Sequence, residues 1–526
     1  MKTLLRNWFL AEACFLYTFL LIWSKKSEHA REKTNAQMIS FIKTAKDRQR
    51  AGFCIPEAII GPNASVPSVR NKYYEQAGAS MKIICSGRHA VGRADRMLYG
   101  HFLEHFHRQI YGGVFDPTSP FADEDGMRED VIEALRRIRT PIIRWPGGCY
   151  VSAYHWKDGV GANRAPTYDK AWRVEESHRF GTDEFIKLCR KIGCEPYICT
   201  NAGTGTAEEM SDWVEYCNLR DMGRWAKARI ANGSPQPHGV KYWSIGNENW
   251  GGHEIGAKDA EEWGRLVREA AKMMLRVDPT IELSAASIPD LDWNLNLLRT
   301  AGQYLDWISI HGYWGNTENG LVPEDYNTVM LRTGADICGA IDRVRAYLTA
   351  LGLEKQIKIA FDEWNLRGWW HPNLMNTGER SKLRNEDEAF YRNSVIAERN
   401  KNDINSVYTM ADAVFSASFL NTCLRNCDLV RMACFSPVVN TRGAIFTHEN
   451  GVVLRPQYFV FELYANLLKE TVLDVWKEDV PTRSGCIRDD VKTVDTADIV
   501  ITYDGKTLKI IFCLKTPPDR VRRRYF

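Results

Sequence analysis

The sequence predicts an α/β protein built on a (β/α)8 barrel, with a strand-rich segment appended at its C-terminal end. Three observations support this fold. Eight short apolar runs alternate with amphipathic segments between residues 96 and 445. The runs are too apolar for strands with one face in water, and buried parallel strands have this composition. No GxGxxG phosphate turn follows the first run, so a doubly wound open sheet fits less well.

The eight predicted strands are short, and turn-forming or polar residues bound each of them. They cover residues 97–104, 141–146, 195–201, 240–248, 281–287, 307–314, 357–365 and 429–439. Strands that alternate with helices in this way are expected to form one parallel sheet, which eight βα units can close into a barrel.

Helices are predicted between the strands from apolar positions three or four residues apart. Thr182, Thr206 and Asp259 are expected to cap three of them, because their side-chain oxygens can accept the first free backbone N–H groups. A fourth helix is predicted around Val131 and Leu135. After residue 450, alternating or apolar runs with turn signals predict a β-rich segment.

The first 80 residues differ from the rest of the chain. Lys2 and Arg6 precede an apolar run from Trp8 to Trp23, whose length suits a signal peptide or a short membrane anchor. Residues 24–80 are polar and aperiodic, which is typical of a linker. A targeting segment and a non-native extension before a start at Met81 are both consistent with this pattern.

Charge and cysteine usage exclude several classes of protein. The chain has 69 Lys+Arg against 66 Asp+Glu, a balance that predicts no nucleic-acid partner. Its 14 Cys show no CxxC and no paired His spacing, so neither a zinc site nor a small disulfide framework is expected. Several of them lie in apolar stretches, which predicts buried free thiols in a reducing compartment. No metal or organic cofactor is implied.

Reactive side chains stand at the ends of several predicted strands, where active sites of such barrels lie. The first, fourth, sixth and seventh strands contribute Glu104, Asn247, Glu248, His311, Tyr313, Asp362 and Glu363. The fourth and seventh strands of an eight-membered ring lie nearly opposite each other. Their carboxyl groups are therefore expected to face each other across the barrel mouth.

Two carboxyl groups that face each other in a cleft rich in Trp and Tyr are typical of enzymes that cleave glycosidic bonds. One donates a proton to the leaving oxygen, and the other attacks the anomeric carbon or activates water. A gap of about 5–5.5 Å gives retention, and a wider gap gives inversion. Alternation along the seventh strand places Asp362 and Glu363 on opposite faces and leaves open which of them faces the barrel.

Several long motifs, in order, resemble those of the α-L-arabinofuranosidases of glycoside hydrolase family 51, in the clan of retaining barrel enzymes. They include YGHFLEHFHRQIYGG (99–113), RWPGGCYVSAYHWKDGVG (144–161), WSIGNENWG (243–251), FDEWN (361–365) and FSPVVNTRGAIF (435–446). The resemblance extends over about residues 81–470.

The resemblance implies roles for individual residues. Glu248 would be the acid/base and Glu363 the nucleophile. Six further residues are expected to bind or border the sugar: Glu104, Asn247, Tyr313, Trp364, Cys149 and His311. Many family members carry Asn where this chain has Cys149, so the polar contact of that position is open, and packing is favoured over a reactive thiol.

The resemblance also implies a domain organisation. Residues 96–445 would form the catalytic barrel, and residues 81–95 would join residues 446–526 in a jelly-roll-like β-sandwich that is short at its C-terminus. Residues 1–80 match nothing in the family.

The implied activity is release of terminal non-reducing α-L-arabinofuranosyl residues from arabinan-type or arabinoxylan-type glycans by retaining double displacement. A homo-oligomer in the cytoplasm is expected, or a secreted or anchored protein if residues 8–23 act as a targeting segment. The alternatives are another retaining glycosidase, such as a β-xylosidase or endoglucanase, a catalytically silent carbohydrate-binding protein, and a membrane-anchored scaffold.

Overall fold

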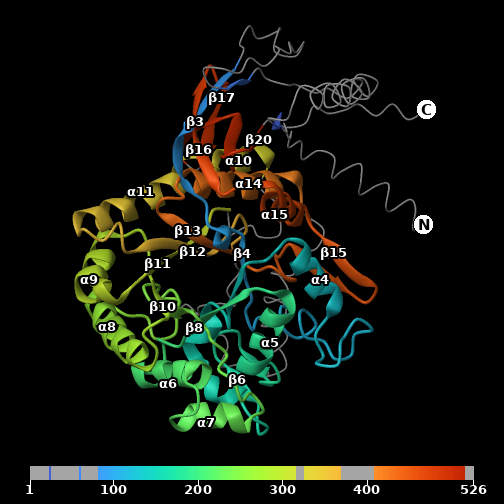
Figure 1. Cartoon of the computed structure of the whole chain (residues 1–526), viewed down its shortest axis with the longest axis vertical. Helices are drawn as coiled ribbons and strands as arrows, with labels where there is room; N and C mark the ends of the chain where they lie inside the picture. Colours follow the sequence, from blue (N-terminus) through green and yellow to red (C-terminus); the bar gives the residue numbers. More distant parts are fainter. Residues whose placement is uncertain are drawn as a thin grey trace, which may run out of the picture.

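The centre of the molecule is a closed barrel of eight parallel strands (Figure 1). The computed structural model describes residues 81–315, 325–368, 408–487 and 489–515, and the backbone of residues 23–24 and 58–60. Around the barrel the order is β4, β5, β8, β9, β10, β11, β12 and β13, and the last strand pairs with the first. The predicted (β/α)8 barrel is confirmed.

Each of the eight predicted runs contains one barrel strand. Their bounds are β4 Gly100–Phe102, β5 Ile142–Trp145, β8 Glu195–Thr200, β9 Tyr242–Ile245, β10 Glu282–Ala286, β11 Trp307–Tyr313, β12 Lys358–Asn365 and β13 Val430–Phe435. Every residue of β5 and β9 is buried, which explains why their sequences are apolar along their whole length.

Helices cover the outer face of the barrel (Figure 1). Those of the described residues are α4 Glu129–Arg137, α5 Thr182–Ile192, α6 Ala207–Asn218, α7 Arg224–Ala231, α8 Ala260–Val277, α9 Leu291–Ala301, α10 Tyr326–Leu331, α11 Ala335–Ala350, α14 Met410–Arg425 and α15 Pro456–Leu467. Thr206 and Asp259 cap α6 and α8 as predicted. The prediction for Thr182 is wrong by one residue: Gly181 occupies the cap position, and the Glu184 carboxylate accepts its N–H.

Two predicted strands are shorter than their apolar runs. Arg96–Tyr99 forms a 3-10 helix, η1, because the Asp95 side chain accepts the N–H of Met97 and starts a turn there. In the second of these strands, β9, the strand ends at Ile245, and Glu248 has a φ of 43°. A left-handed backbone cannot continue a strand, so Glu248 lies in the turn after β9 and not on the strand.

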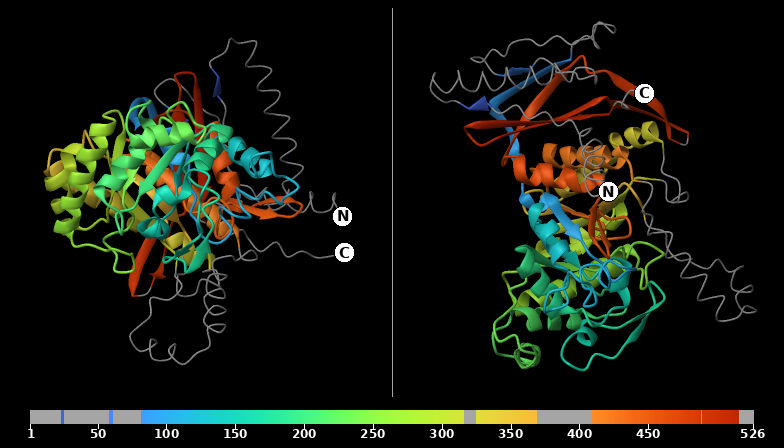
Figure 2. Two further views of the ribbon diagram at one scale, coloured as in Figure 1. Left: turned by 90° about the horizontal axis from the view of Figure 1, so that it is seen from below. Right: turned by 90° about the vertical axis from the view of Figure 1, so that its right-hand side faces the viewer.

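A strand-rich domain lies at one end of the barrel (Figure 2). Its sheet has the order β1-β20-β19-β16-β3-β2, with bounds Trp23–Ser24, Thr507–Leu514, Ala497–Tyr503, Thr471–Glu478, Lys82–Arg93 and Ala58–Ile60. Val472, Val500 and Ile511 pack with the barrel core, whereas Leu473 and Ile499 belong to a separate apolar cluster. The fold is therefore a barrel with an appended C-terminal β-sandwich domain.

Residues expected in the sandwich also serve the barrel. Helix α15 packs against barrel residues, since the Phe461 ring contacts His101 and Trp364. Between the barrel and the sheet the chain forms the hairpin of β14 (Ile445–His448) with β15 (Gly451–Leu454). A second hairpin, β17 (Thr482–Ile487) with β18 (Asp490–Asp495), is inserted between the sheet strands β16 and β19. The predicted domain boundaries at residues 80, 95 and 445 remain a prediction.

Long loops after the barrel strands build the mouth of the barrel. The loop after β5 contains two 3-10 helices, η2 (Cys149–Ala153) and η3 (Trp156–Gly159). It also contains the hairpin of β6 (Thr167–Asp169) with β7 (Val174–Glu176). A further 3-10 helix, η4 (Gly302–Tyr304), lies elsewhere and directly follows α9. Except for Trp23, the apolar run predicted as a possible anchor lies outside the described residues. Among the residues that are described, no helix has the length and apolarity needed to cross a bilayer.

Candidate active site

Glu248 and Glu363 converge at the mouth of the barrel. A carboxylate oxygen of each and a ring nitrogen of His311 all lie within 4.8 Å of one another. The predicted meeting of the two carboxylates is confirmed. This bound leaves less room than the wide gap of inverting glycosidases needs, and it favours the close pair of about 5–5.5 Å that retaining glycosidases use.

Glu363 accepts hydrogen bonds from two side chains, those of Arg144 and Tyr313. Arg144 Nη1 donates to its Oε2 at 2.8 Å, and the Tyr313 hydroxyl donates to its Oε1 at 2.5 Å. Tyr313 also lies 2.8 Å from Ser436 Oγ. Gly148 forms the adjoining backbone, where an added Cβ would lie 3.2 Å from Glu363 Oε2. A side chain at position 148 would therefore press on the Glu363 carboxylate.

Asp362 and Glu363 both point into the barrel. The pairing of β12 with β13 shifts register between Phe361 and Trp364, which indicates a bulge, and a bulge breaks the alternation of faces. Asp362 accepts hydrogen bonds from Tyr197 and Ser309 at 2.8 and 2.6 Å, below the mouth. Glu363 is the carboxylate at the mouth, so the question that alternation left open is decided by the bulge.

Glu248 is held by two histidines. Its Oε2 lies 2.7 Å from His253 Nε2, and its Oε1 lies 2.7 Å from His311 Nδ1. Its backbone occupies the left-handed region, which a non-glycine residue adopts at a cost of about 1–3 kcal/mol when the surroundings impose it. The turn after β9 thus turns the Glu248 carboxylate toward the pocket.

The pKa values of Glu248 and His311 are shifted in opposite directions. Burial by itself raises the pKa of Glu248, but the hydrogen bonds from His253 and His311 outweigh it and hold that pKa below its ordinary value. Burial opposes a charge on His311, but Glu363, Asp362 and Glu248 outweigh it and raise the pKa of His311 to about 10. At neutral pH, His311 is therefore a cation between three carboxylates.

Glu104 and Asn247 lie beside the two carboxylates at the mouth of the barrel. Glu104 Oε1 accepts N–H groups from Gly148, Tyr150 and the Trp172 indole at 3.2, 3.1 and 3.0 Å. Burial, with the nearby charge of Glu363, raises the pKa of Glu104 well above its ordinary value. The Asn247 side chain accepts from Arg144 Nη2 at 2.8 Å, which joins it to the support of Glu363.

A further carboxylate, Glu254, lies behind Asn247. Its Oε1 accepts from Asn247 Nδ2 and its Oε2 from Ser152 Oγ, each at 2.8 Å. Burial and the neighbouring charge of Glu248 raise the pKa of Glu254 to about 7. Cys149 lies beside it, and burial raises the pKa of the Cys149 thiol well above its ordinary value. A half-buried thiol whose pKa is raised in this way is not an activated nucleophile.

Comparisons with known proteins agree with this geometry. The family model of the alpha-L-arabinofuranosidase 1 domain matches residues 134–327, and that of the alpha-L-arabinofuranosidase C-terminal domain matches residues 362–508. The chain is 34% identical over 395 residues to the intracellular exo-alpha-(1->5)-L-arabinofuranosidase 1 of Bacillus subtilis, a match that covers 73% of this chain and 75% of that relative.

Two solved structures are similar as well. The Thermotoga maritima alpha-L-arabinofuranosidase has a TM-score of 0.70 at 35% identity, over 82% of this chain and 85% of that one. The GH51 alpha-L-arabinofuranosidase of Thermotoga petrophila has a TM-score of 0.68 at 36% identity, over 82% and 84%. The chain belongs to the α-L-arabinofuranosidases of glycoside hydrolase family 51.

One residue expected to border the sugar in this arabinofuranosidase family member does not do so. Trp364 is fully buried, and its ring stacks on Phe419 with centroids 3.8 Å apart. It follows Glu363 on β12 and therefore points outward, into the layer between strands and helices. Trp314 likewise packs on Phe361 and Phe415. The other expected site residues gather around the two carboxylates.

Three residues that hold this site together were not predicted. Arg144 is a charged residue inside the apolar strand β5, and a charge in such a run must find a buried partner. Its position was therefore a signal that sequence reasoning could have used. His253 and Glu254 belong to the loop after β9, where no periodic pattern indicates which side chains turn inward.

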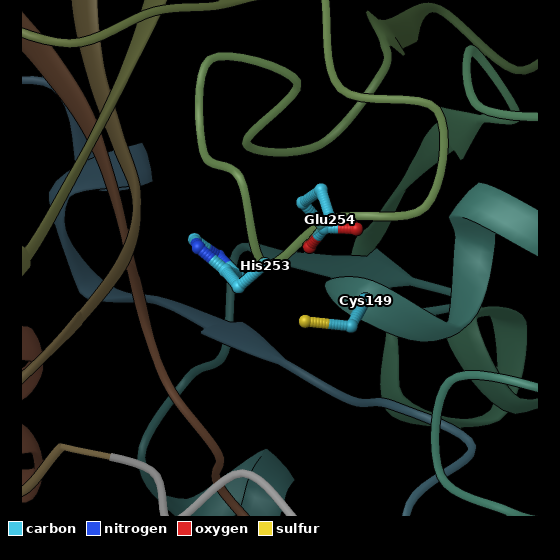
Figure 3. Close-up of side chains that lie close together, drawn as sticks. All are labelled: Cys149, His253 and Glu254. Carbon is cyan, nitrogen blue, oxygen red and sulfur yellow. The ribbon is translucent and has the colours of Figure 1, made fainter. Parts of the chain in front are cut away.

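Two groups of side chains among the described residues have the spacing of metal ligands. One is the cluster of Glu248, His311 and Glu363, and the other is Cys149 with His253 and Glu254 (Figure 3). In the first group, His311 Nδ1 already lies 2.7 Å from Glu248 Oε1 and 3.7 Å from Glu363 Oε2. The second group brings together a thiol, an imidazole and a carboxylate from two different loops.

Proposed function

We propose that this protein releases terminal non-reducing α-L-arabinofuranosyl residues by a retaining double displacement, with Glu363 as nucleophile and Glu248 as acid/base. One observation carries the proposal: the two carboxylates lie within 4.8 Å of each other, and each has the partners its role requires. The nucleophile has Arg144 and Tyr313 as donors, and the acid/base has two histidines.

The first step forms a covalent furanosyl-enzyme. Glu363 attacks the anomeric carbon while the leaving oxygen takes a proton from Glu248, so the bond to the aglycone breaks as the ester bond forms. Arg144 orients the attacking oxygen, and its charge complements the carboxylate. Asn247 and Glu104 lie beside the same pocket and can hold sugar hydroxyls, whose contacts tighten in the transition state.

The proton for the leaving group is stored next to Glu248. In the free enzyme, hydrogen bonds from the two histidines hold the pKa of Glu248 low, and each of its oxygens lies 2.7 Å from an imidazole nitrogen. A proton that moves along either bond makes Glu248 the acid. Once Glu363 is esterified, its negative charge is lost, which favours ionised Glu248 as the base that activates water in the second step.

Substrate class and location follow from the relatives. The Bacillus subtilis relative is named as acting on α-(1→5)-linked arabinofuranosyl residues and as intracellular. We propose arabinan-type or arabinoxylan-type oligosaccharides as substrates and the cytoplasm as the site of action. The twelve cysteines in the described part of the chain are all free thiols, as a reducing compartment favours. The expected homo-oligomer stays a prediction, which light scattering of the purified protein checks.

The test is hydrolysis of nitrophenyl α-L-arabinofuranoside by the wild type and by Glu363→Ala. We expect turnover by the wild type, loss of turnover in the variant, and rescue by azide with formation of the β-arabinofuranosyl azide, because azide then enters from the side of the missing nucleophile. Nitrophenyl β-xyloside and a cellobioside serve as control substrates.

Two results would contradict the proposal. Faster hydrolysis of a control substrate would favour a β-xylosidase or an endoglucanase. Arabinose binding without turnover by the wild type would favour a silent carbohydrate-binding protein.

A further inference from the structure

Cys149, His253 and Glu254 bring three different ligand types to one point beside the catalytic pocket. Cys149 starts η2 in the loop after β5, and the other two residues follow Glu248 in the loop after β9 (Figure 3). One sulfur, one nitrogen and one oxygen atom of the three side chains lie within 4.8 Å of one another. Small side-chain rotations would bring such atoms to one ion.

The chemistry of this set is that of a zinc site. Thiolate sulfur, imidazole nitrogen and carboxylate oxygen are the protein ligands that Zn²⁺ takes, and three of them with one open position are typical of zinc sites that exchange a ligand. The open position here would be filled by water. Hard cations such as Mg²⁺ prefer all-oxygen sites and would not select this set.

The carboxylate of this group is oriented by neighbours, as metal-binding carboxylates are. Ser152 Oγ donates to Glu254 Oε2, and Asn247 Nδ2 donates to Glu254 Oε1, each at 2.8 Å. Glu254 itself is only 6% exposed. Fixed ligand orientation by such outer hydrogen bonds raises metal affinity, typically by about 10–100-fold.

The same side chains support the catalytic residues. His253 lies 2.7 Å from Glu248 Oε2, and Glu254 accepts the hydrogen bond that orients Asn247. A metal ion that takes His253 Nε2 and Glu254 Oε1 as ligands competes with both hydrogen bonds. Occupation of this group therefore disturbs the acid/base and a sugar-binding residue at once.

We propose that Cys149, His253 and Glu254 form an inhibitory site for a soft divalent metal ion, with Zn²⁺ as the preferred ion. When the ion binds, a metal–sulfur bond replaces the S–H bond of Cys149, and the thiol proton passes to solvent. Neither oxidant nor reductant is needed. The inhibitory part rests on the proposed hydrolase function, whereas metal binding is independent of it.

The binding test uses the full chain loaded with Co²⁺ or Zn²⁺. We expect one equivalent of metal by elemental analysis and a thiolate-to-cobalt charge-transfer band in the absorption spectrum. Cys149→Ser should abolish the band and weaken Zn²⁺ binding, measured by titration calorimetry, by at least about 100-fold. The matched control is Cys486→Ser, which removes an exposed thiol of β17 and should leave both readouts unchanged.

The inhibition test follows nitrophenyl arabinofuranoside hydrolysis against Zn²⁺ concentration, with chelator to restore activity. The half-inhibitory concentration should match the dissociation constant from calorimetry in the wild type and in Cys486→Ser. His253→Gln, checked for folding by thermal unfolding, should also lose the bound equivalent.

Three outcomes separate the parts of the proposal. An unchanged charge-transfer band in Cys149→Ser would overturn the site. Zinc bound at this site with full hydrolytic activity would overturn its inhibitory role. A protein that binds zinc through Cys149 but hydrolyses no arabinofuranoside would overturn the proposed function and leave the metal site standing.

Discussion

Glu363 and Glu248 lie on opposite sides of one pocket and are held in different ways. Glu363 is part of a barrel strand, is 5% exposed, and accepts hydrogen bonds from an arginine and a tyrosine. Glu248 lies in a turn with a left-handed backbone and is bound by two histidines. The proposed nucleophile is paired with an arginine, which stays charged, whereas the proposed acid/base is bound by two imidazoles, which can take up and release protons.

This difference shows how one pocket separates two roles for the same side chain. Arginine keeps its charge throughout the proposed cycle, so the charge of Glu363, the proposed nucleophile, is always complemented. An imidazole can hold or return a proton, and each carboxylate oxygen of the proposed acid/base has an imidazole nitrogen at 2.7 Å. Environment, and not residue type, assigns the roles.

The comparison is tested most strongly by matched amide substitutions. Glu363→Gln should lower kcat/KM by at least about 10⁴-fold with any leaving group, because no covalent intermediate forms. Glu248→Gln should lose about 10²–10⁴-fold on an arabinofuranosyl disaccharide but far less on the dinitrophenyl glycoside, whose leaving group needs no proton. The measurement is kcat/KM for both variants on both substrates. Equal losses for Glu248→Gln on the two substrates would contradict its role as acid.

The support of the nucleophile predicts a large effect on stability. Arg144→Met removes the cation between Asp362 and Glu363 and should lower the free energy of unfolding by about 3–5 kcal/mol, since it leaves buried carboxylates uncompensated. Urea unfolding measures this change. The control is Arg265→Met, whose ion pair with Glu261 is exposed to solvent, and which should change stability by less than about 0.5 kcal/mol. A similar loss of stability in both variants would show that Arg144 does not compensate the buried charges of Asp362 and Glu363.

A smaller effect concerns pH. Burial opposes the charge of Asp362, but Arg144 and His311 outweigh it and lower its pKa from 3.8 to about 2. Because the folded pKa lies below the unfolded one, this group stabilises the protein fully above about pH 4, and the contribution is lost as the pH falls toward 2. The stability difference between wild type and Asp362→Asn should therefore shrink over that range in urea unfolding curves. Exposed Asp221→Asn is the control and should show no such trend. A constant difference for Asp362→Asn would contradict the assignment.

Much of the fold could be predicted from the sequence because burial leaves a direct trace in composition. Each barrel strand lies in an apolar run, since both faces of a strand in a closed barrel are covered. Capping residues such as Thr206 and Asp259 act within a few residues of their own position, so local sequence was enough to find them. The strand ends were predicted too long where a turn or a left-handed residue interrupts the apolar run, as at Arg96–Tyr99 and Glu248.

What the sequence by itself determined is the barrel, the strand ends that carry carboxylates, and the opposition of Glu248 and Glu363, because all three depend on local pattern and on the count of strands. Only the tertiary structure decided that a bulge turns both Asp362 and Glu363 inward, that Trp364 packs outside the barrel, and that Arg144, His253 and Glu254 complete the site. These features depend on contacts between residues tens to hundreds of positions apart. Periodicity within one segment carries no information about such contacts.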